Sequence, residues 1–384
     1  MSQPDAIRLT RPLIDWTARQ IHDPVWRLRY LRTVAPSVFS PSWKSRKTIG
    51  LLTLFGFGLV VAPLSLRMLG AANAAAPTLP ARVPPPPAPP IQHMESPAAP
   101  SAEVWQVEKT SDFEIYSNGL RIENQYAVSH RPRAYRAFSR DYPDGSSAEK
   151  RTEPVGIVYH TTESLQAPFE PGQNNVLKRV GESLLEYVRR RRCYNFLIDR
   201  FGRVYRIVNE SDAADHAGHS VWADARYFYV NLNDSFIGIS FEAQTVAGET
   251  TTSAGNAQVR AGAMLTEMLR SRYKIASENC VTHAQVSVNP SNMQVGYHVD
   301  WASSFPFEGL GLPDNYATPS PAISLFGFAF DASFEQRAGV RLAAGALEAD
   351  HALLEGAQAA HLSLAAYRKT LHRRYLQITA RRNG

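Results

Sequence analysis

The strongest constraint in this sequence is a run without a single charged residue, from Ile49 to Leu66. The run contains 18 residues and lies between Lys47 and Arg67. As a helix it would be about 27 Å long, close to the roughly 30 Å of a bilayer's hydrocarbon core. A helix buried in a protein core normally has one polar face, and this run has none. The sequence therefore predicts a transmembrane anchor or signal at residues 49–69.

Basic residues precede this run and predict its orientation. Residues 1–48 hold nine Lys or Arg and three Asp. Because basic residues stay on the cytoplasmic side, residues 1–48 are expected to form a basic cytoplasmic segment, with the rest of the chain outside the cytoplasm. The alternative is cleavage near Ala74, because Ala72-Asn73-Ala74 has the small-residue pattern of a signal peptidase site. The cleaved product would be secreted.

A proline-rich stretch follows the apolar run. From Pro77 to Pro100, ten of 24 residues are proline. Such a composition favours the extended polyproline II conformation, which acts as a semi-rigid spacer. We therefore interpret residues 75–103 as a linker between the membrane and a folded domain.

The charge distribution argues against one class of partner. The net charge of the chain is +6, and residues 1–48 alone contribute nine positive and three negative charges, which is also +6. A protein that binds nucleic acid usually spreads basic residues over its folded domain, so we expect no nucleic-acid partner. The two cysteines are too few for a disulfide framework or a Cys-rich zinc module.

Residues 104–315 alternate short β-branched runs with amphipathic patterns. This alternation predicts an α/β domain with a single mixed β-sheet flanked by helices. The expected elements are strands at Val155–Tyr159 and Phe236–Phe241, a hairpin of Tyr194–Ile198 and Arg203–Val208, and helices at Asn175–Arg192 and Ala257–Tyr273. Residues 334–380 are rich in Ala and Leu and are predicted to form a helical C-terminal tail.

Three histidines have flanks that suggest a function. His160 ends a hydrophobic strand, His283 follows a short β-like run, and His298 lies two residues before Asp300. Zinc binds imidazole and carboxylate groups, and catalytic sites use three protein ligands. Two histidines and one aspartate on separate loops at a sheet edge would suit such a site. The spacing alone also fits ordinary structural histidines, because the sequence contains no H-E-x-x-H motif.

Five segments, in order, resemble the zinc amidase family of AmpD-type and T7-type N-acetylmuramoyl-L-alanine amidases and the peptidoglycan recognition proteins. Any one segment is a weak signal, but five in the same order are a strong one. The segments are Val155-Gly-Ile-Val-Tyr-His-Thr161, the Cys193–Tyr205 hairpin, Asp215-His-Ala-Gly-His-Ser220, Ser235-Phe-Ile-Gly-Ile-Ser-Phe241, and Gln258 through His283.

The resemblance implies a zinc ion and its ligands. His160 and His283 would be two ligands. Asp300 would be the third, with His298 in the position of a family lysine, although His298 could itself be the ligand. The segment between the second and third ligands is longer than in the family, so an insertion at Val286–Val295 must be accommodated.

The resemblance also implies roles around the metal. Tyr194 would donate a hydrogen bond to the developing oxyanion. Many members place a catalytic glutamate where this chain has Ser240, and Glu242 would lie on the same face of the strand as general base. His298 is the other candidate for proton transfer. His216, Thr161 and Ser240 would bind substrate.

Taken together, these roles imply zinc-dependent hydrolysis of the amide between N-acetylmuramic acid and L-alanine of peptidoglycan. The partners would be peptidoglycan or muropeptides, and the inner membrane through residues 49–69, with the catalytic domain in the periplasm. The alternatives are a non-catalytic peptidoglycan-binding module and a membrane scaffold. Strand alternation predicts that the thiols of Cys193 and Cys280 face away from the site. They could form a disulfide if their strands were neighbours.

Overall fold

We describe residues 103–246, 251–331 and 333–382 of the 384-residue chain from a computed structural model. The predicted basic segment at 1–48, the anchor at 49–69 and all but the last residue of the 75–103 linker lie outside the described residues. In the described ranges, no helix is long and apolar enough to cross a membrane.

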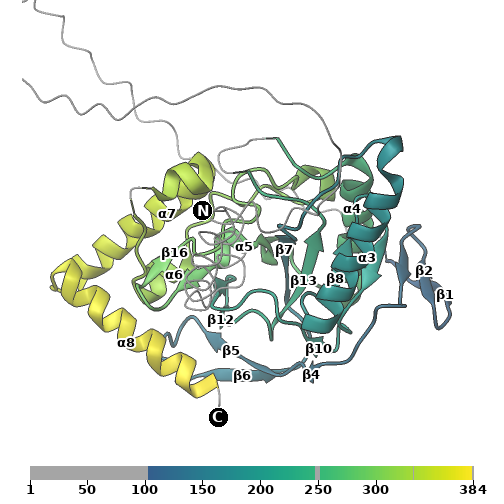
Figure 1. The fold of residues 1–384 in the computed structure, drawn as a ribbon. Coiled ribbons are helices and arrows are strands. Elements are labelled where there is room, and N and C mark those ends of the chain that lie inside the picture. Colours follow the sequence, from purple (N-terminus) through teal and green to yellow (C-terminus); the bar gives the residue numbers. More distant parts are fainter. Residues whose placement is uncertain (1–102, 247–250, 332, 383–384) are drawn as a thin grey trace, which may run out of the picture. The chain divides into compact units, whose positions relative to one another are not determined.

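A mixed eight-stranded sheet forms the centre of the described domain (Figure 1), with the order β1-β2-β3-β9-β8-β13-β7-β14. β7, β8, β13 and β14 run parallel to one another, whereas β9 is antiparallel to β8. The predicted mixed sheet is therefore confirmed. The strands are β1 Gln106–Lys109, β2 Phe113–Tyr116, β3 Arg121–Glu123, β7 Gly156–Thr161, β8 Phe196–Ile198, β9 Val204–Arg206, β13 Phe236–Phe241 and β14 Cys280–Thr282.

Smaller sheets surround this one. A four-stranded sheet has the order β11-β12-β5-β6, and two pairs are β10-β4 and β15-β16. Their strands are β4 Arg131–Pro132, β5 Tyr135–Ser139, β6 Ala148–Arg151, β10 Asp212–Ala213, β11 Val221–Ala223, β12 Tyr227–Val230, β15 Val288–Asn289 and β16 Gln294–Val295.

Two long helices pack on opposite faces of the central sheet. α4, Asn256–Tyr273, packs Leu265 and Leu269 in one cluster with Tyr159 of β7. α3, Asn174–Arg191, packs Leu184 in another cluster with Leu197 of β8. Because strand side chains alternate between faces, His160 lies on the face opposite Tyr159, which is the face of Leu197 and α3. The candidate site thus lies on the α3 face of the sheet.

The short helices lie in the connections and after the sheet. They are α5 His283–Val286 and α6 Pro321–Phe326, with 3₁₀ turns η1 Pro171–Gln173, η2 Ser277–Asn279 and η3 Glu308–Leu310.

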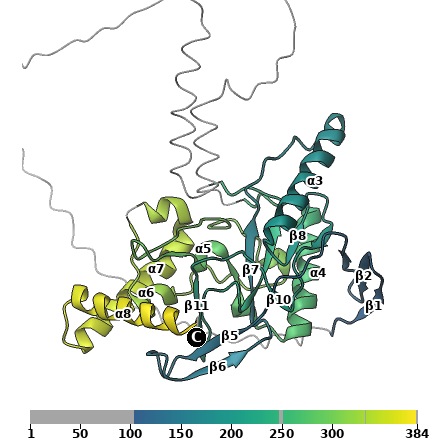
Figure 2. The same ribbon diagram turned by 60° about the horizontal axis from the view of Figure 1, so that its bottom comes forward.

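The predicted C-terminal tail consists of two helices, α7 Phe334–Ala359 and α8 Leu364–Arg382. They are helical as predicted, but they are not a separate appendage. Leu342 of α7 and Tyr375 of α8 belong to the same hydrophobic cluster as Tyr159 of the central sheet. The end of α8 lies beside β5 and β6 (Figure 2), where Arg381 donates a hydrogen bond to the carbonyl of Asp144. Burial of apolar side chains therefore joins these helices to the domain.

Candidate metal centre

Parallel strands bring the two candidate histidines to one edge of the sheet. β14 pairs in parallel with β7, and Thr282 lies opposite Tyr159 in that register. His160 is the next residue on β7, and His283 is the first residue of α5 immediately after β14. The Gln285 side chain accepts a hydrogen bond from the main-chain N–H of Thr282 (2.9 Å), which fixes the turn from strand to helix. The two histidines therefore leave neighbouring strands at the same end.

The insertion at Val286–Val295 brings Asp300 back to these histidines. It forms a small antiparallel hairpin in which Val288 pairs with Val295. After the hairpin, the main-chain N–H of His298 donates to Ser287 Oγ (3.0 Å), and Ala284 N–H donates to the carbonyl of Asp300 (3.3 Å). The inserted residues thus form a hairpin, and the Asp300 carboxylate that follows it lies beside α5.

The three predicted ligands converge on one point. His160 Nδ1 lies 3.1 Å from Asp300 Oδ2, and His283 Nδ1 lies 2.9 Å from Asp300 Oδ1. The ring centroids of the two histidines are 4.5 Å apart. In the described part of the chain, these residues form a group whose ligand atoms all lie within 4.8 Å of one another. The structure therefore brings together the set of side chains that the sequence nominated.

Burial determines the charge state of this group. His160, His283 and Asp300 are 1%, 5% and 8% exposed. Burial and the neighbouring His283 lower the pKa of His160 to about 4, which favours the neutral ring. Burial opposes ionisation of Asp300, but the two histidines prevail and hold the pKa of its carboxyl well below the ordinary range. A carboxylate and neutral imidazole together leave a negative site that suits a cation.

The donor set fits zinc. Two ligand atoms about 2.0–2.1 Å from a tetrahedral zinc ion lie roughly 3.3 Å apart. The histidine–carboxylate distances of 2.9 and 3.1 Å are close to that separation. His283 Nε2 is buried with no hydrogen-bond partner among the described residues, so this ring also has an uncompensated nitrogen. His160, His283 and Asp300 would hold the ion.

Tyr194 lies beside the metal group on a strained stretch of backbone. Its ring centroid is 5.1 Å from that of His160. Its φ of 64° is in the left-handed region, which costs a non-glycine residue about 1–3 kcal/mol. The next residue, Asn195, holds this geometry because its buried amide bonds to Gly238 N–H and to the carbonyl of Val208. Burial raises the pKa of Tyr194, so its hydroxyl keeps its proton and can donate a hydrogen bond.

His298 lies at the open side of the group. Its exposed ring stacks on His283, with centroids 4.6 Å apart and an interplanar angle of 17°. The exposed ring of Tyr297 lies edge-on to it at 4.7 Å. Asp300 rather than His298 belongs to the converging ligand group, which leaves the His298 ring accessible to a substrate.

His216 contacts the ring nitrogen of His160 that does not face Asp300. Its Nδ1 is 3.1 Å from His160 Nε2, and its Nε2 is 3.3 Å from the carbonyl oxygen of Phe236. Burial, together with the nearby His160 and Arg133, lowers the pKa of His216 well below its ordinary value. The sequence analysis predicted that His216 contacts substrate, and the structure places it against His160, a candidate metal ligand.

The other nominated residues have different surroundings. Ser240 is buried opposite His160 in the parallel register of β13 and β7. The hydroxyl of Thr161 donates to Glu163 Oε1 (2.7 Å) and contacts Thr245 Oγ1 (3.1 Å), so it ties two loops together.

Glu242 is not among the contacts of the metal group. It directly follows β13, and its main-chain N–H still donates to the carbonyl of Ile198 in β8. Its Oε2 instead accepts a hydrogen bond from the main-chain N–H of Arg200 (3.2 Å). It lines a cavity of about 580 Å³ that also includes Leu185 of α3. Burial raises the pKa of Glu242 despite that hydrogen bond.

Both cysteines are free. Burial raises the pKa of Cys193 to about 11 and that of Cys280 to about 12, so neither is readily a thiolate ligand. Neither belongs to the metal group found among the described residues, in agreement with the strand-alternation argument.

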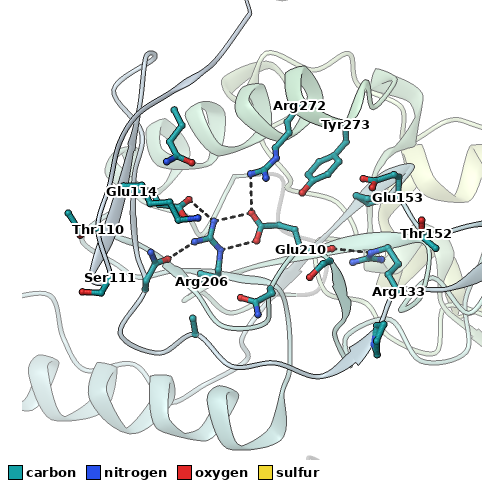
Figure 3. A pocket seen from close by; sticks show the side chains of 18 residues that line it. Thr110, Ser111, Glu114, Arg133, Thr152, Glu153, Arg206, Glu210, Arg272 and Tyr273 are labelled. Carbon is teal, nitrogen blue, oxygen red and sulfur yellow. Dashed lines mark hydrogen bonds and ion pairs between the residues drawn. The ribbon is translucent and has the colours of Figure 1, made fainter.

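A larger polar cavity, of about 980 Å³, holds a second cluster of charges (Figure 3). Arg206 donates to Glu114 at 2.9 Å and to Glu210 at 2.8 and 3.0 Å. Arg272 lies 3.9 Å from Glu210. The hydrogen bond from Arg206 outweighs burial and lowers the pKa of Glu114 to about 2. Sequence reasoning missed this cluster, because no motif connects β2 with the residues after β9.

A comparison with models of known protein families finds one match. Residues 150–295 match the family model described as N-acetylmuramoyl-L-alanine amidase. This range contains His160, Tyr194, His216 and His283, and it ends before Asp300. Among curated proteins, no sequence matches this chain.

Several solved structures are similar to part of the chain. The N-acetylmuramoyl-L-alanine amidase LysC from Clostridium intestinale URNW is 20% identical, with 49% of this chain and 93% of that chain covered and a TM-score of 0.27. The amidase AmiD from E. coli, in complex with anhydro-N-acetylmuramic acid-L-Ala-D-gamma-Glu-L-Lys, is 23% identical over 42% of this chain and 57% of its own, with a TM-score of 0.30. AmpDh3 from Pseudomonas aeruginosa, in complex with anhydromuramic pentapeptide, is 22% identical over 41% and 58%, with a TM-score of 0.30. These TM-scores are low, so the similarity to the amidases is carried by the match of residues 150–295 to the family model.

Proposed function

Because residues 150–295 match the family model of N-acetylmuramoyl-L-alanine amidases, we propose that this chain is a zinc-dependent hydrolase of peptidoglycan. The bond cleaved is the amide between the lactyl group of N-acetylmuramic acid and L-alanine. The observation that carries the proposal is the convergence of His160, His283 and Asp300 at one end of parallel strands. The reaction adds one water across the C–N bond, so that the lactyl carbon gains a hydroxyl and the alanine nitrogen leaves with a proton.

The metal would supply the electrophilic part of this chemistry. Zinc, when bound, provides Lewis-acid activation of water and of the scissile carbonyl. His160, His283 and Asp300 would hold the ion, and their burial keeps competing water away from the ligand atoms. A water-poor site also strengthens each electrostatic interaction within it.

Tyr194 would stabilise the charge that develops on the carbonyl oxygen. Its ring lies beside His160, and its raised pKa keeps the phenol protonated. A hydrogen bond that is made only as negative charge develops lowers the barrier without tightening ground-state binding. The strained φ at Tyr194 is consistent with such a positioning requirement.

His298 is the better placed of the two candidates for proton transfer. Its exposed ring is stacked on His283, whereas the hydrogen bond of the Glu242 carboxylate is to the β8–β9 turn. A proton taken from the attacking water by His298 would be delivered to the leaving nitrogen of L-alanine. Ser240, in the position of the family glutamate, has no ionisable group for this step.

The test is product analysis with purified peptidoglycan and the full chain. Wild-type protein is expected to release free stem peptides and leave glycan strands intact, and His283→Ala is expected to release none because it loses the metal. His351→Ala, an exposed histidine on α7, is the matched control and is expected to keep full activity. Tight binding without released peptide would contradict the hydrolase and favour the non-catalytic binding module. Undiminished activity in His283→Ala would contradict the ligand assignment.

A further inference from the structure

A chain of hydrogen bonds runs from the metal group into the interior behind it. His160 Nε2 contacts His216 Nδ1 at 3.1 Å, and His216 Nε2 contacts the carbonyl oxygen of Phe236 at 3.3 Å. Arg133 Nη1 donates to that same carbonyl at 3.0 Å. The chain thus links a candidate ligand, a second histidine, a main-chain acceptor and a buried arginine.

The chemistry of these groups fixes where the protons lie. A carbonyl oxygen can only accept, so His216 Nε2 must carry a hydrogen. Arg133 is 2% exposed and donates to four main-chain carbonyls, those of Glu210, Asp212, Asp234 and Phe236. His160 Nδ1 faces Asp300 within the ligand group, and His160 Nε2 faces His216 Nδ1. An imidazole that binds a metal through Nδ1 carries its hydrogen on Nε2, so His216 Nδ1 is the acceptor in the contact between the rings.

The tautomer of His160 follows from this. With a lone pair at His216 Nδ1, the hydrogen in the contact between the rings belongs to His160 Nε2. A neutral His160 then has its own lone pair at Nδ1, which lies 3.1 Å from Asp300 Oδ2. Two electron-rich atoms face each other there, an arrangement that a cation between them stabilises.

We propose that His216 is a positioning residue that fixes the Nε2–H tautomer of His160 and presents its Nδ1 lone pair to the metal. This inference rests on the proposed function for the identity of the ion. That His216 also binds substrate, as the family resemblance implies, stays a prediction. Hydrogen bonds to the outer nitrogen of a ligand histidine commonly set its orientation and raise its basicity.

The surroundings of His216 are built to hold the ring in place. Asn233 Oδ1 accepts hydrogen bonds from three successive main-chain N–H groups, those of His216, Ala217 and Gly218, at 3.0, 2.6 and 3.3 Å. The ring packs against Gly238 of β13, where an added Cβ would lie 2.6 Å from His216 Cγ. Only a glycine at that position leaves room for the ring.

The test compares two variants of nearly matched size in the full chain. His216→Asn keeps an oxygen acceptor at the Nδ1 position, whereas His216→Leu removes the acceptor. We expect His216→Leu to weaken zinc affinity, measured by chelator competition, by about 10–100-fold. His216→Asn is expected to retain most of the affinity. Gly238→Ala, which displaces the ring without changing its chemistry, is expected to weaken zinc binding as well.

The second readout is the ring tautomer of His160 in the zinc-bound protein, observed by long-range ¹H–¹⁵N correlation, because it reports which ring nitrogen binds the ion. Nε2–H in wild type and a changed tautomer distribution in His216→Leu would support the proposal. Nδ1–H in wild type, or equal zinc affinity in both His216 variants, would overturn it. A wild-type protein that binds zinc and shows Nε2–H but releases no stem peptide would refute the proposed amidase activity while leaving the role of His216 intact.

Discussion

Two buried clusters of ionisable side chains differ in how their charges are balanced. In the polar cavity, Arg206 lies between Glu114 and Glu210, and Arg272 adds a second cation. In the metal group, both ion pairs of Asp300 are with histidines, and the lowered pKa of His160 makes that ring a poor cation. The carboxylates of the first cluster are neutralised by arginines, whereas the carboxylate of the second faces only histidine rings.

This difference indicates a structural role for the Arg206 cluster and a chemical role for the histidine cluster. Burial of a charge is costly unless a partner or a metal compensates it. The Arg206 cluster requires no ligand, because its arginines compensate the charges of its own carboxylates. The histidine cluster is completed only by a proton or a metal ion. The cavity of about 980 Å³ thus holds charges that neutralise one another (Figure 3), so a large cavity does not by itself mark the reactive site.

The largest expected effect is on the stability of the protein when the arginine of the polar cluster is replaced. Arg206→Met leaves the carboxylates of Glu114 and Glu210 buried together, so we expect the free energy of unfolding to fall by about 3 kcal/mol. Zinc affinity is expected to stay unchanged. Denaturant unfolding and chelator competition measure the two quantities. Adding Glu114→Gln and Glu210→Gln is expected to recover part of the loss, and a loss of zinc binding in Arg206→Met would break the comparison.

A smaller effect concerns acid. The pKa of Glu114 is about 2 in the folded protein, against an ordinary value of 4.5. Because the folded value is depressed, the stabilisation is present above pH 4.5 and is lost as the pH falls toward 2. Since the cavity admits solvent, we expect this contribution to be only about 1 kcal/mol. Unfolding measured across this window should depend less on pH in Glu114→Gln than in wild type, and equal slopes would refute the contribution.

Much of the sheet was predictable because its strands are buried and strongly patterned. The Phe236–Phe241 strand has the predicted bounds, and the predicted helix at Ala257–Tyr273 begins one residue earlier, at Asn256. The sequence also nominated His160, His283 and Asp300, which the structure brings together. The strands and helices were predictable because period-two and helical patterns reflect burial directly. The three candidate ligands were predictable because the segments around them resemble the amidase family.

Other features had no signal in the sequence. The contact of His216 with Phe236 is to a main-chain oxygen, and every residue has one. Glu242 was expected on the site face, but its carboxylate accepts a hydrogen bond from the main-chain N–H of Arg200. The packing of α7 and α8 into the main core depends on long-range contacts that an Ala- and Leu-rich segment does not specify. Such features follow from tertiary structure and not from local pattern.

The metal content of the purified full chain tests directly whether His160, His283 and Asp300 bind zinc. We expect about one zinc ion per wild-type chain, little or none in Asp300→Asn, which keeps the side-chain size but removes the charge, and wild-type content in Arg206→Met. Equal zinc in wild type and Asp300→Asn, or a wild-type protein that binds no zinc when the ion is supplied, would contradict this ligand assignment.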